Sequence, residues 1–267
     1  MDVRKRNHVK VQGSKPTAIV FAHGFGCDQN MWRFLVPHFS DRYTTVAFDL
    51  VGSGQSDLQA YDYAKYDKLQ GYADDLLEII DAVCSGPVIF VGHSVSAMIG
   101  LLAGIKAPDR FQSHVMIGPS PCYINDADYV GGFSRADIDG LLDTMESNYL
   151  GWSSNMAPAI MGAPDRPELG IELTNSFCRT DPDIAKHFAR TTFLSDNRSD
   201  LPNLLAPTLV IQCSDDLIAP RSVGDYMQRV LPRGTLRVIQ NIGHCPHLSS
   251  PGACVDAIDE FLRTPGV

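Results

Sequence analysis

The stretch from Pro87 to Ala97, Pro-Val-Ile-Phe-Val-Gly-His-Ser-Val-Ser-Ala, decides the fold of this chain. An apolar segment typical of a buried strand leads into a Gly-x-Ser-x-small turn, and a helix-like segment follows over residues 97–103. Such a strand–turn–helix elbow raises the hydroxyl of Ser94 above the end of a sheet, where the N–H of Val95 faces the same space. Ser94 is therefore a candidate nucleophile, provided that a base lies beside it.

Short apolar strands alternate with amphipathic helices on both sides of this elbow. The segments with strand character are 17–22, 44–48, 87–91, 114–118, 208–211 and 235–239, and those with helical spacing are 72–83, 97–103, 223–230 and 255–262. Nearly continuous apolar strands separated by helices are typical of a parallel sheet that is buried on both faces. The sequence therefore predicts an α/β fold with a mostly parallel, doubly wound sheet.

The middle of the chain breaks this alternation. Residues 120–204 contain no convincing strand, but apolar side chains recur there at helical spacing. The clearest series is Ile138, Leu141, Leu142, Met145, Tyr149, Trp152 and Met156. We predict that residues 120–204 form a helical cap, inserted into a core made of residues 1–119 and 205–267.

An acid and a base follow later strands in the order that an activated serine requires. In sheets of this type the nucleophile, the acid and the histidine come in that order along the chain, each at the carboxyl end of a strand. Asp216 follows the strand 208–211 and His244 follows the strand 235–239. Asp215 competes with Asp216, and the four-residue distance to the later proline favours Asp216. His247 competes with His244, and the Gly-His pair favours His244.

The turn His23-Gly24-Phe25-Gly26 follows the first apolar strand. Glycines let a backbone approach a ligand closely. We expect the N–H groups of Phe25 and Val95 to stabilise the oxyanion of a reacting carbonyl group. A cap over Ser94 must also supply the walls of a substrate pocket. The residues that we predict to form this pocket are Tyr123, Phe133, Leu141, Trp152, Met156, Phe193 and Leu217.

Composition excludes several other classes of function. A formal net charge of −9 argues against a nucleic-acid partner, which would require a basic surface. The most apolar run, residues 96–105, is too short to span a bilayer, and the polar N-terminus does not resemble a secretory signal. The seven cysteines are scattered without a C-x-x-C pair, which favours reduced thiols in a cytoplasmic protein. We expect no membrane association, no metal and no organic cofactor.

Several motifs in the core and the cap together resemble one branch of a known family. They are Gly92-His-Ser-Val-Ser-Ala97, Pro119–Tyr123, Asn125-Asp126, Gly131–Phe133, Asn148-Tyr149, Phe193–Asp196 with Arg198, Gln212-Cys213, Asp216 with Ala219-Pro220, and Gly243–His247. With these motifs the chain resembles the α/β-hydrolases, and within them the RsbQ family of bacterial stress-response regulators. The plant strigolactone and karrikin receptors belong to the same branch.

The resemblance implies an α/β-hydrolase fold with a four-helix, V-shaped cap over a deep hydrophobic pocket. Ser94, Asp216 and His244 would lie beneath it. The implied activity is hydrolysis of a small hydrophobic ester or lactone, coupled to bacterial stress signalling. The alternative is a small-molecule receptor that turns its ligand over slowly and signals through a partner, which for RsbQ is a phosphatase with a PAS domain.

Overall fold

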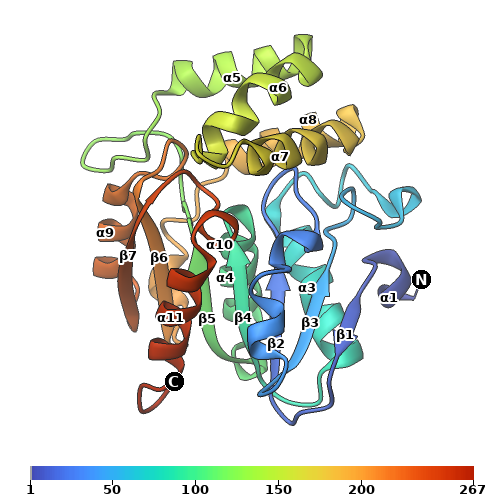
Figure 1. The fold of residues 1–267 in the computed structure, drawn as a ribbon, viewed down its shortest axis with the longest axis vertical. Coiled ribbons are helices and arrows are strands. Elements are labelled where there is room, and N and C mark those ends of the chain that lie inside the picture. The colour runs from blue at the N-terminus through green and yellow to red at the C-terminus, as the bar shows by residue number, and fades with distance from the viewer. Residues whose placement is uncertain (1) are drawn as a thin grey trace.

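Within residues 2–267, which the computed structural model describes, seven strands form one sheet at the centre of the molecule (Figure 1). Their order across the sheet is β1-β3-β2-β4-β5-β6-β7. The strands are β1 (Lys10–Gln12), β2 (Ala18–Ala22), β3 (Thr44–Phe48), β4 (Val88–His93), β5 (Phe111–Ile117), β6 (Thr208–Asp215) and β7 (Gly234–Ile242). β1 runs antiparallel to β3, and every other neighbouring pair is parallel. The predicted mostly parallel α/β sheet is thus confirmed.

Helices cover both faces of the sheet, as the apolar strands require. Besides four long helices between β5 and β6, the helices and short 3₁₀ segments are α1 (Val3–Arg6), η1 (Gln29–Trp32), α2 (Val36–Phe39), η2 (Leu58–Ala60), α3 (Leu69–Val83), α4 (Val95–Lys106), η3 (Pro108–Arg110), η4 (Leu201–Asn203), α9 (Arg221–Val230), α10 (Pro246–Ser249) and α11 (Pro251–Leu262). Alternate side chains of β2 show how the two faces are used. Val20 packs with residues of α3 and α4, whereas Ile19 and Phe21 pack with residues of α2 and α11.

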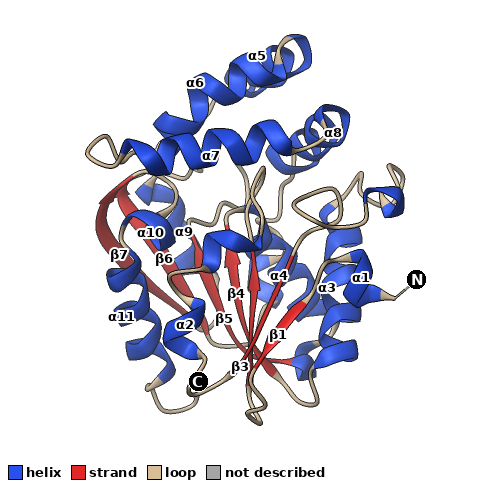
Figure 2. Cartoon of the chain, turned by 45° about the vertical axis from the view of Figure 1, so that its right-hand side comes forward, coloured by secondary structure: helices blue, strands red, loops and turns tan. Residues whose placement is uncertain are grey.

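Four long helices lie over the carboxyl ends of the strands (Figure 1, Figure 2). They are α5 (Arg135–Ser147), α6 (Tyr149–Met161), α7 (Pro167–Arg179) and α8 (Pro182–Phe193). α5 and α6 form an outer layer, and α7 and α8 lie between this layer and the core. All four helices fall between β5 and β6, the interval from which we expect the cap. The exact division at residues 120 and 204 stays a prediction.

Local sequence signals explain where the cap helices begin and end. Ser134 and Asp137 form a reciprocal capping box at the start of α5, and the side chain of Asn148 accepts a hydrogen bond from the first turn of α6. Gly162 ends α6 in a left-handed conformation. These stops fold the segment into separate helices, whose apolar faces form one cluster with core residues near Ser94.

β1 was not predicted from the sequence. This strand has three residues, all exposed, so it carries no burial pattern that could predict a strand. Of the helices in residues 2–267, none has the length and apolar character needed to cross a bilayer.

Candidate active site

Ser94 lies in the turn between β4 and α4, in a strained backbone conformation. Its φ of 55° and ψ of −124° are rare for a residue with a side chain. The N–H of Ser94 donates to the carbonyl of Ile117 at 2.8 Å, which ties the turn to the neighbouring strand. A Cβ on Gly92 would lie 2.7 Å from the carbonyl oxygen of Ser96, so only glycine lets the strand and the helix approach this closely. The predicted elbow geometry is present.

His244 reaches Ser94 from the loop after β7. Its Nε2 lies 2.8 Å from Oγ of Ser94, although 150 positions separate the two residues in sequence. The N–H of His244 donates to the carbonyl of Ile160 at 2.8 Å, near the end of α6. The cap therefore helps to hold the backbone that carries this imidazole.

Asp216 lies on the other side of the imidazole. Its Oδ2 accepts a hydrogen bond from Nδ1 of His244 at 2.8 Å, and its Oδ1 accepts from the N–H groups of Ile218 and Ala219 at 2.8 and 3.1 Å. The Asp216 side chain is fully buried. Because a carboxylate accepts hydrogen bonds, Nδ1 carries the proton and Nε2 is free to accept the proton of the Ser94 hydroxyl.

Asp215 and His247, the alternatives to Asp216 and His244, lie outside the hydrogen-bonded chain. Asp215 is the last residue of β6 and is exposed. His247 is buried between Trp32 and His93, with ring-centroid distances of 4.8 and 4.4 Å, and neither of its ring nitrogens has a hydrogen-bond partner among the described residues. The structure thus brings together Ser94, Asp216 and His244, the three residues favoured by the sequence.

Two backbone N–H groups are available near Ser94. Val95 is the first residue of α4, so its N–H has no partner within the helix. The turn that carries Phe25 lies against the nucleophile, because a Cβ on Gly24 would be 3.2 Å from Cβ of Ser94. This placement suits the oxyanion role that we predict for the N–H groups of Phe25 and Val95.

A small apolar cavity lies above Ser94, between core and cap. Its volume is about 30 Å³, which is room for about two water molecules. It is lined by Phe25, Cys27, His93, Ser94, Tyr123, Trp152, Ile160, Leu173, Phe177, Thr192, Phe193, Ile218, His244 and Cys245. Aromatic rings fill most of the space: Phe25 packs against Trp152, Phe177 and Phe193 at centroid distances of 5.9 to 6.4 Å.

Three of the seven predicted pocket residues, Tyr123, Trp152 and Phe193, line this cavity. Four do not. Phe133, Leu141 and Met156 are half-buried and pack at the rim of the apolar cluster, so they support the cap from outside the cavity. Leu217 is 51 % exposed. In the tight turn that hydrogen-bonds to Asp216, the adjacent Ile218 points inward instead.

Seven other residues line the cavity but were not predicted from the sequence: Cys27, Ile160, Leu173, Phe177, Thr192, Ile218 and Cys245. Some of these residues could have been predicted from their helical spacing. Leu173 and Phe177 are four positions apart on α7 and share a helical face with Leu169. Thr192 could not have been predicted from the sequence, because a threonine near a helix end is common on protein surfaces.

Burial keeps the groups around the hydrogen-bonded chain neutral. It raises the pKa of Tyr123 to about 12 and raises the pKa of the Cys245 thiol above its ordinary value. It also lowers the pKa of His93 well below the usual range. Because neutral, poorly hydrated groups surround the site, electrostatic interactions within it are only weakly screened.

Within residues 2–267, one group of three side chains could approach a metal ion. The ligand atoms of His93, Cys245 and His247 lie within 4.8 Å of one another. Nε2 of His93 donates to the carbonyl of His244 at 2.9 Å, however, and a Cβ on Gly24 would lie 2.5 Å from Nδ1 of His93. Both nitrogens of this ring therefore face protein atoms, and we assign the group a packing role.

Comparison with known proteins identifies the family of this chain. A family model described as the alpha/beta hydrolase family matches residues 19–257. The chain belongs to the alpha/beta hydrolase family. This alpha/beta hydrolase is 40 % identical to the karrikin insensitive 2 receptor CA of Petunia hybrida, over 96 % of its own length and 95 % of the relative. It is 38 % identical to the strigolactone esterase D14 of Arabidopsis thaliana, over 96 % of its own length and 94 % of the relative.

A solved structure of a hydrolase from Oleispira antarctica is similar over nearly the whole molecule. Its sequence is 44 % identical, the TM-score is 0.95, and the match covers 98 % of this chain and 97 % of that one. The relatives of this alpha/beta hydrolase thus include proteins named as hydrolases or esterases and a protein named as a receptor.

Proposed function

We propose that this alpha/beta hydrolase is a serine hydrolase that cleaves a small, largely apolar carboxylic ester or lactone. The observation that carries the proposal is the hydrogen-bonded chain from Ser94 through His244 to Asp216, with both links at 2.8 Å. This chain ends beneath an apolar cavity, so the hydroxyl faces the space that a substrate would occupy. Nucleophile, base and orienting acid are thus in the relative positions that acyl transfer requires.

In the first half of the reaction, Nε2 of His244 takes the proton of the Ser94 hydroxyl as Oγ attacks the carbonyl carbon. The N–H groups of Phe25 and Val95 stabilise the resulting oxyanion. Asp216 holds the imidazole in the correct tautomer and stabilises its positive charge. Collapse of the tetrahedral intermediate breaks the ester bond, and His244 returns the proton to the leaving alkoxide.

In the second half, water attacks the acyl group on Ser94 while His244 again acts as the base. An ester yields an alcohol and an acid. A lactone yields one hydroxy acid, because its leaving alkoxide stays attached to the acyl group. His93 lines the cavity, and its bond to the carbonyl of His244 helps to fix the loop. We assign His93 a positioning role.

The cavity supports a small apolar substrate with one polar contact. Thr192 is 1 % exposed and lines the cavity, and its hydroxyl has no hydrogen-bond partner among the described residues. A buried hydroxyl without a partner favours a ligand that supplies one. Because the cavity is small and aromatic rings line it, we expect these rings to shift when a substrate larger than a few atoms enters.

The direct test is hydrolysis of p-nitrophenyl acetate by the wild type and by Ser94→Ala. We expect the substitution to lower kcat by about a thousand-fold or more. Ser154→Ala is the matched control, because Ser154 lies exposed on α6 and bonds only to the carbonyl of Leu150. Equal rates for the wild type and Ser94→Ala would refute the proposed nucleophile.

A second candidate function is a receptor that hydrolyses its ligand slowly. Two observations favour it: the similarity to a protein named as a karrikin insensitive 2 receptor, and the small volume of the cavity beneath the cap. Turnover should be measured together with ligand-induced changes in thermal stability. Slow turnover with a large stabilising shift supports the receptor, whereas fast turnover without a shift supports the enzyme alone.

From the sequence motifs we further propose a cytoplasmic protein that is related to the RsbQ regulators and has a PAS-domain phosphatase as partner. The resemblance rests on the Val95-Ser96-Ala97 continuation and on the cap motifs, and the cytoplasmic location rests on the seven scattered cysteines. Co-purification with a PAS-domain phosphatase from the same cell tests it. Copurification that is lost or strengthened in Ser94→Ala supports coupling between the site and signalling. No association with any such phosphatase would contradict this proposal and leave the hydrolase untouched.

A further inference from the structure

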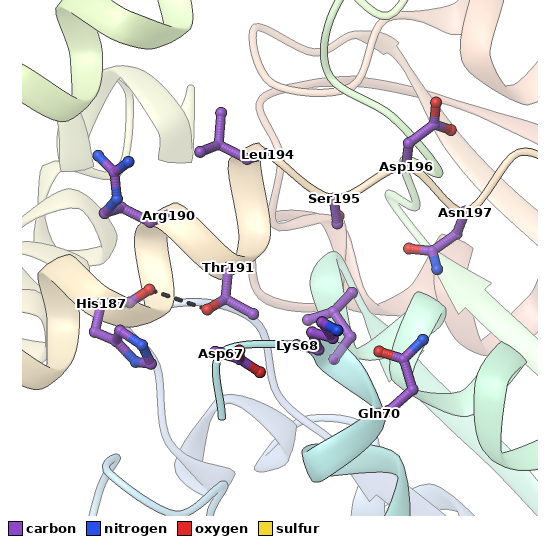
Figure 3. A pocket seen from close by; sticks show the side chains of 11 residues that line it. Asp67, Lys68, Gln70, His187, Arg190, Thr191, Leu194, Ser195, Asp196 and Asn197 are labelled. Atoms are coloured by element: carbon purple, nitrogen blue, oxygen red, sulfur yellow. Dashed lines mark hydrogen bonds between the residues drawn. The ribbon is translucent and has the colours of Figure 1, made fainter. Parts of the chain in front are cut away.

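A second cavity lies at the junction of core and cap, separate from the one above Ser94 (Figure 3). Its volume is about 440 Å³, within the range of small-molecule sites. One wall is formed by residues 67–70 at the start of α3, and the other by parts of residues 187–197, from α8 and the segment after it. We call it the α3–α8 cavity. It is more than ten times as large as the catalytic cavity.

Positive charge gathers at this cavity. α3 has 15 residues, and Lys68 at its N-cap makes no side-chain capping bond. The N–H of Gly71 donates to the carbonyl of Lys68, whereas the N–H groups of Leu69 and Gln70 have no acceptor among the described residues. The positive end of the helix dipole points the same way. Lys68 and Arg190 both line the cavity, and neither forms an ion pair within residues 2–267. Of the two carboxylates in the lining, Asp196 is paired with Arg198 and Asp67 is unpaired among the described residues; outside the lining, the carboxylate of Asp200 contacts the amide nitrogen of Asn197.

A buried amide provides an independent indication of a ligand. Asn197 lines the cavity and is 5 % exposed. Its Nδ2 donates to the carboxylate of Asp200 at 3.0 Å, and its backbone N–H donates to the carbonyl of Pro121 at 2.7 Å. Because a carboxylate accepts hydrogen bonds, the Asp200 contact fixes which end of the amide is oxygen. Oδ1 is then a buried acceptor with no donor among the described residues.

Figure 3 shows Asn197 on the side of the cavity where Lys68 and Gln70 lie, with its side chain extending toward them. A ligand in this space would place its negative charge at the open N–H groups of α3 and beside Lys68. It would also have to supply an O–H or N–H donor for Oδ1 of Asn197, since a bare anion offers only acceptors.

We propose that the α3–α8 cavity binds a small organic anion that carries a hydroxyl donor, either a hydroxycarboxylate or a phosphorylated polyol. Such a ligand would bridge core and cap. Thr191 lines the α3–α8 cavity, while the next two residues of α8, Thr192 and Phe193, line the catalytic cavity. Occupation of the larger cavity therefore acts on the helix end that forms one wall of the smaller one.

Isothermal titration calorimetry of the full chain in phosphate-free buffer tests the proposal with four probes: glycerol 3-phosphate, gluconate, inorganic phosphate and glycerol. The first two carry both an anionic group and a hydroxyl donor, and they separate the phosphate source from the carboxylate source. We expect at least one of them to bind about ten-fold or more tightly than either inorganic phosphate or glycerol.

Three variants locate the binding. Lys68→Ala with Arg190→Ala should weaken binding of the tighter probe by about ten-fold or more. Lys5→Ala is the matched control, because Lys5 is exposed, unpaired among the described residues and not part of the cavity lining, and it should change affinity by less than about two-fold. Asn197→Leu should remove the advantage of the hydroxylated anion over inorganic phosphate.

Failure of both hydroxylated anions to bind, or an equal loss in Lys5→Ala, would overturn the proposal. So would survival of the hydroxyl advantage in Asn197→Leu. If Asn197→Leu does not fold, the Lys68 and Arg190 substitutions still decide, because both side chains are exposed. Calorimetry measures the heat of binding and does not require hydrolysis. The binding test and the Ser94→Ala test of the proposed hydrolase can therefore fail independently.

Discussion

His114 should make the fold sensitive to acid, and His114→Leu should remove part of that sensitivity. The imidazole is fully buried in β5 and neither ring nitrogen has a hydrogen-bond partner among the described residues. Phe111 stacks on the ring at a centroid distance of 4.8 Å, and a Cβ on Gly104 would lie 2.7 Å from Nε2 of His114. Burial of the charged form lowers the pKa of His114 from 6.5 to about 3.

The direction follows from proton binding. Between the two pKa values the unfolded chain protonates His114 and the folded chain does not, so the unfolded state binds more protons. The free energy of unfolding therefore rises with pH between about 3 and about 6.5. The contribution of His114 is fully present above about pH 6.5 and is lost progressively as the pH falls below that value. Integrated from about pH 7.5 to about pH 5, the loss due to this one group is about 2 kcal/mol.

Urea denaturation followed by circular dichroism at the two pH values measures the effect. The wild type should lose about 2 kcal/mol more than His114→Leu between them, because every other titrating group is common to both proteins. Phe111→Leu is the control: it perturbs packing against the same ring but should lose as much as the wild type on acidification. Equal losses in His114→Leu and the wild type would show that the buried imidazole is protonated in the folded state, and the reasoning would be wrong.

Three further outcomes test the active site with p-nitrophenyl esters. Asp216→Asn should lower kcat by about 10⁴-fold with the fold retained, because the amide favours the wrong tautomer of His244. The kcat of Asp215→Asn should stay near that of the wild type. Similar losses of kcat in both variants would show that Asp216 is not the acid. Gly24→Ala should lower kcat by about 10²-fold or more, because the added Cβ would lie 2.5 Å from Nδ1 of His93 and displace the turn that carries the N–H of Phe25. An unchanged kcat would show that the N–H of Phe25 is not the oxyanion donor. Phe177→Ala should shift the preferred acyl chain toward longer esters, because its ring fills the catalytic cavity; an unchanged chain-length profile would mean that this ring does not limit substrate size.

The core of the fold could be predicted because its signals are local. β4 and α4 are recognisable from apolar runs on either side of Ser94, and the order of the later acid and histidine follows from the strands that they succeed. The edge strand β1 could not be predicted, because three exposed residues leave no pattern. Its strand conformation comes from pairing with β3.

The pocket was predicted less well, since the cap has no sheet to fix its faces. Trp152 and Met156 lie one helical turn apart on α6, yet only Trp152 reaches the cavity. Leu217 and Ile218 are neighbours of equal hydrophobicity, and the turn held by Asp216 decides which of them points inward.

By itself, the sequence determined an α/β core, an elbow at Ser94, and a short list of acids and histidines with the correct order. It favoured Asp216 over Asp215 and His244 over His247 from local patterns, but it contained no distance between their side chains and Ser94. Only the tertiary structure joined Ser94 to His244 across 150 positions and left Asp215 and His247 outside the hydrogen-bonded chain. The reason is physical: periodicity reports which face of one element is buried, whereas the distance between side chains on different elements depends on how the whole chain packs.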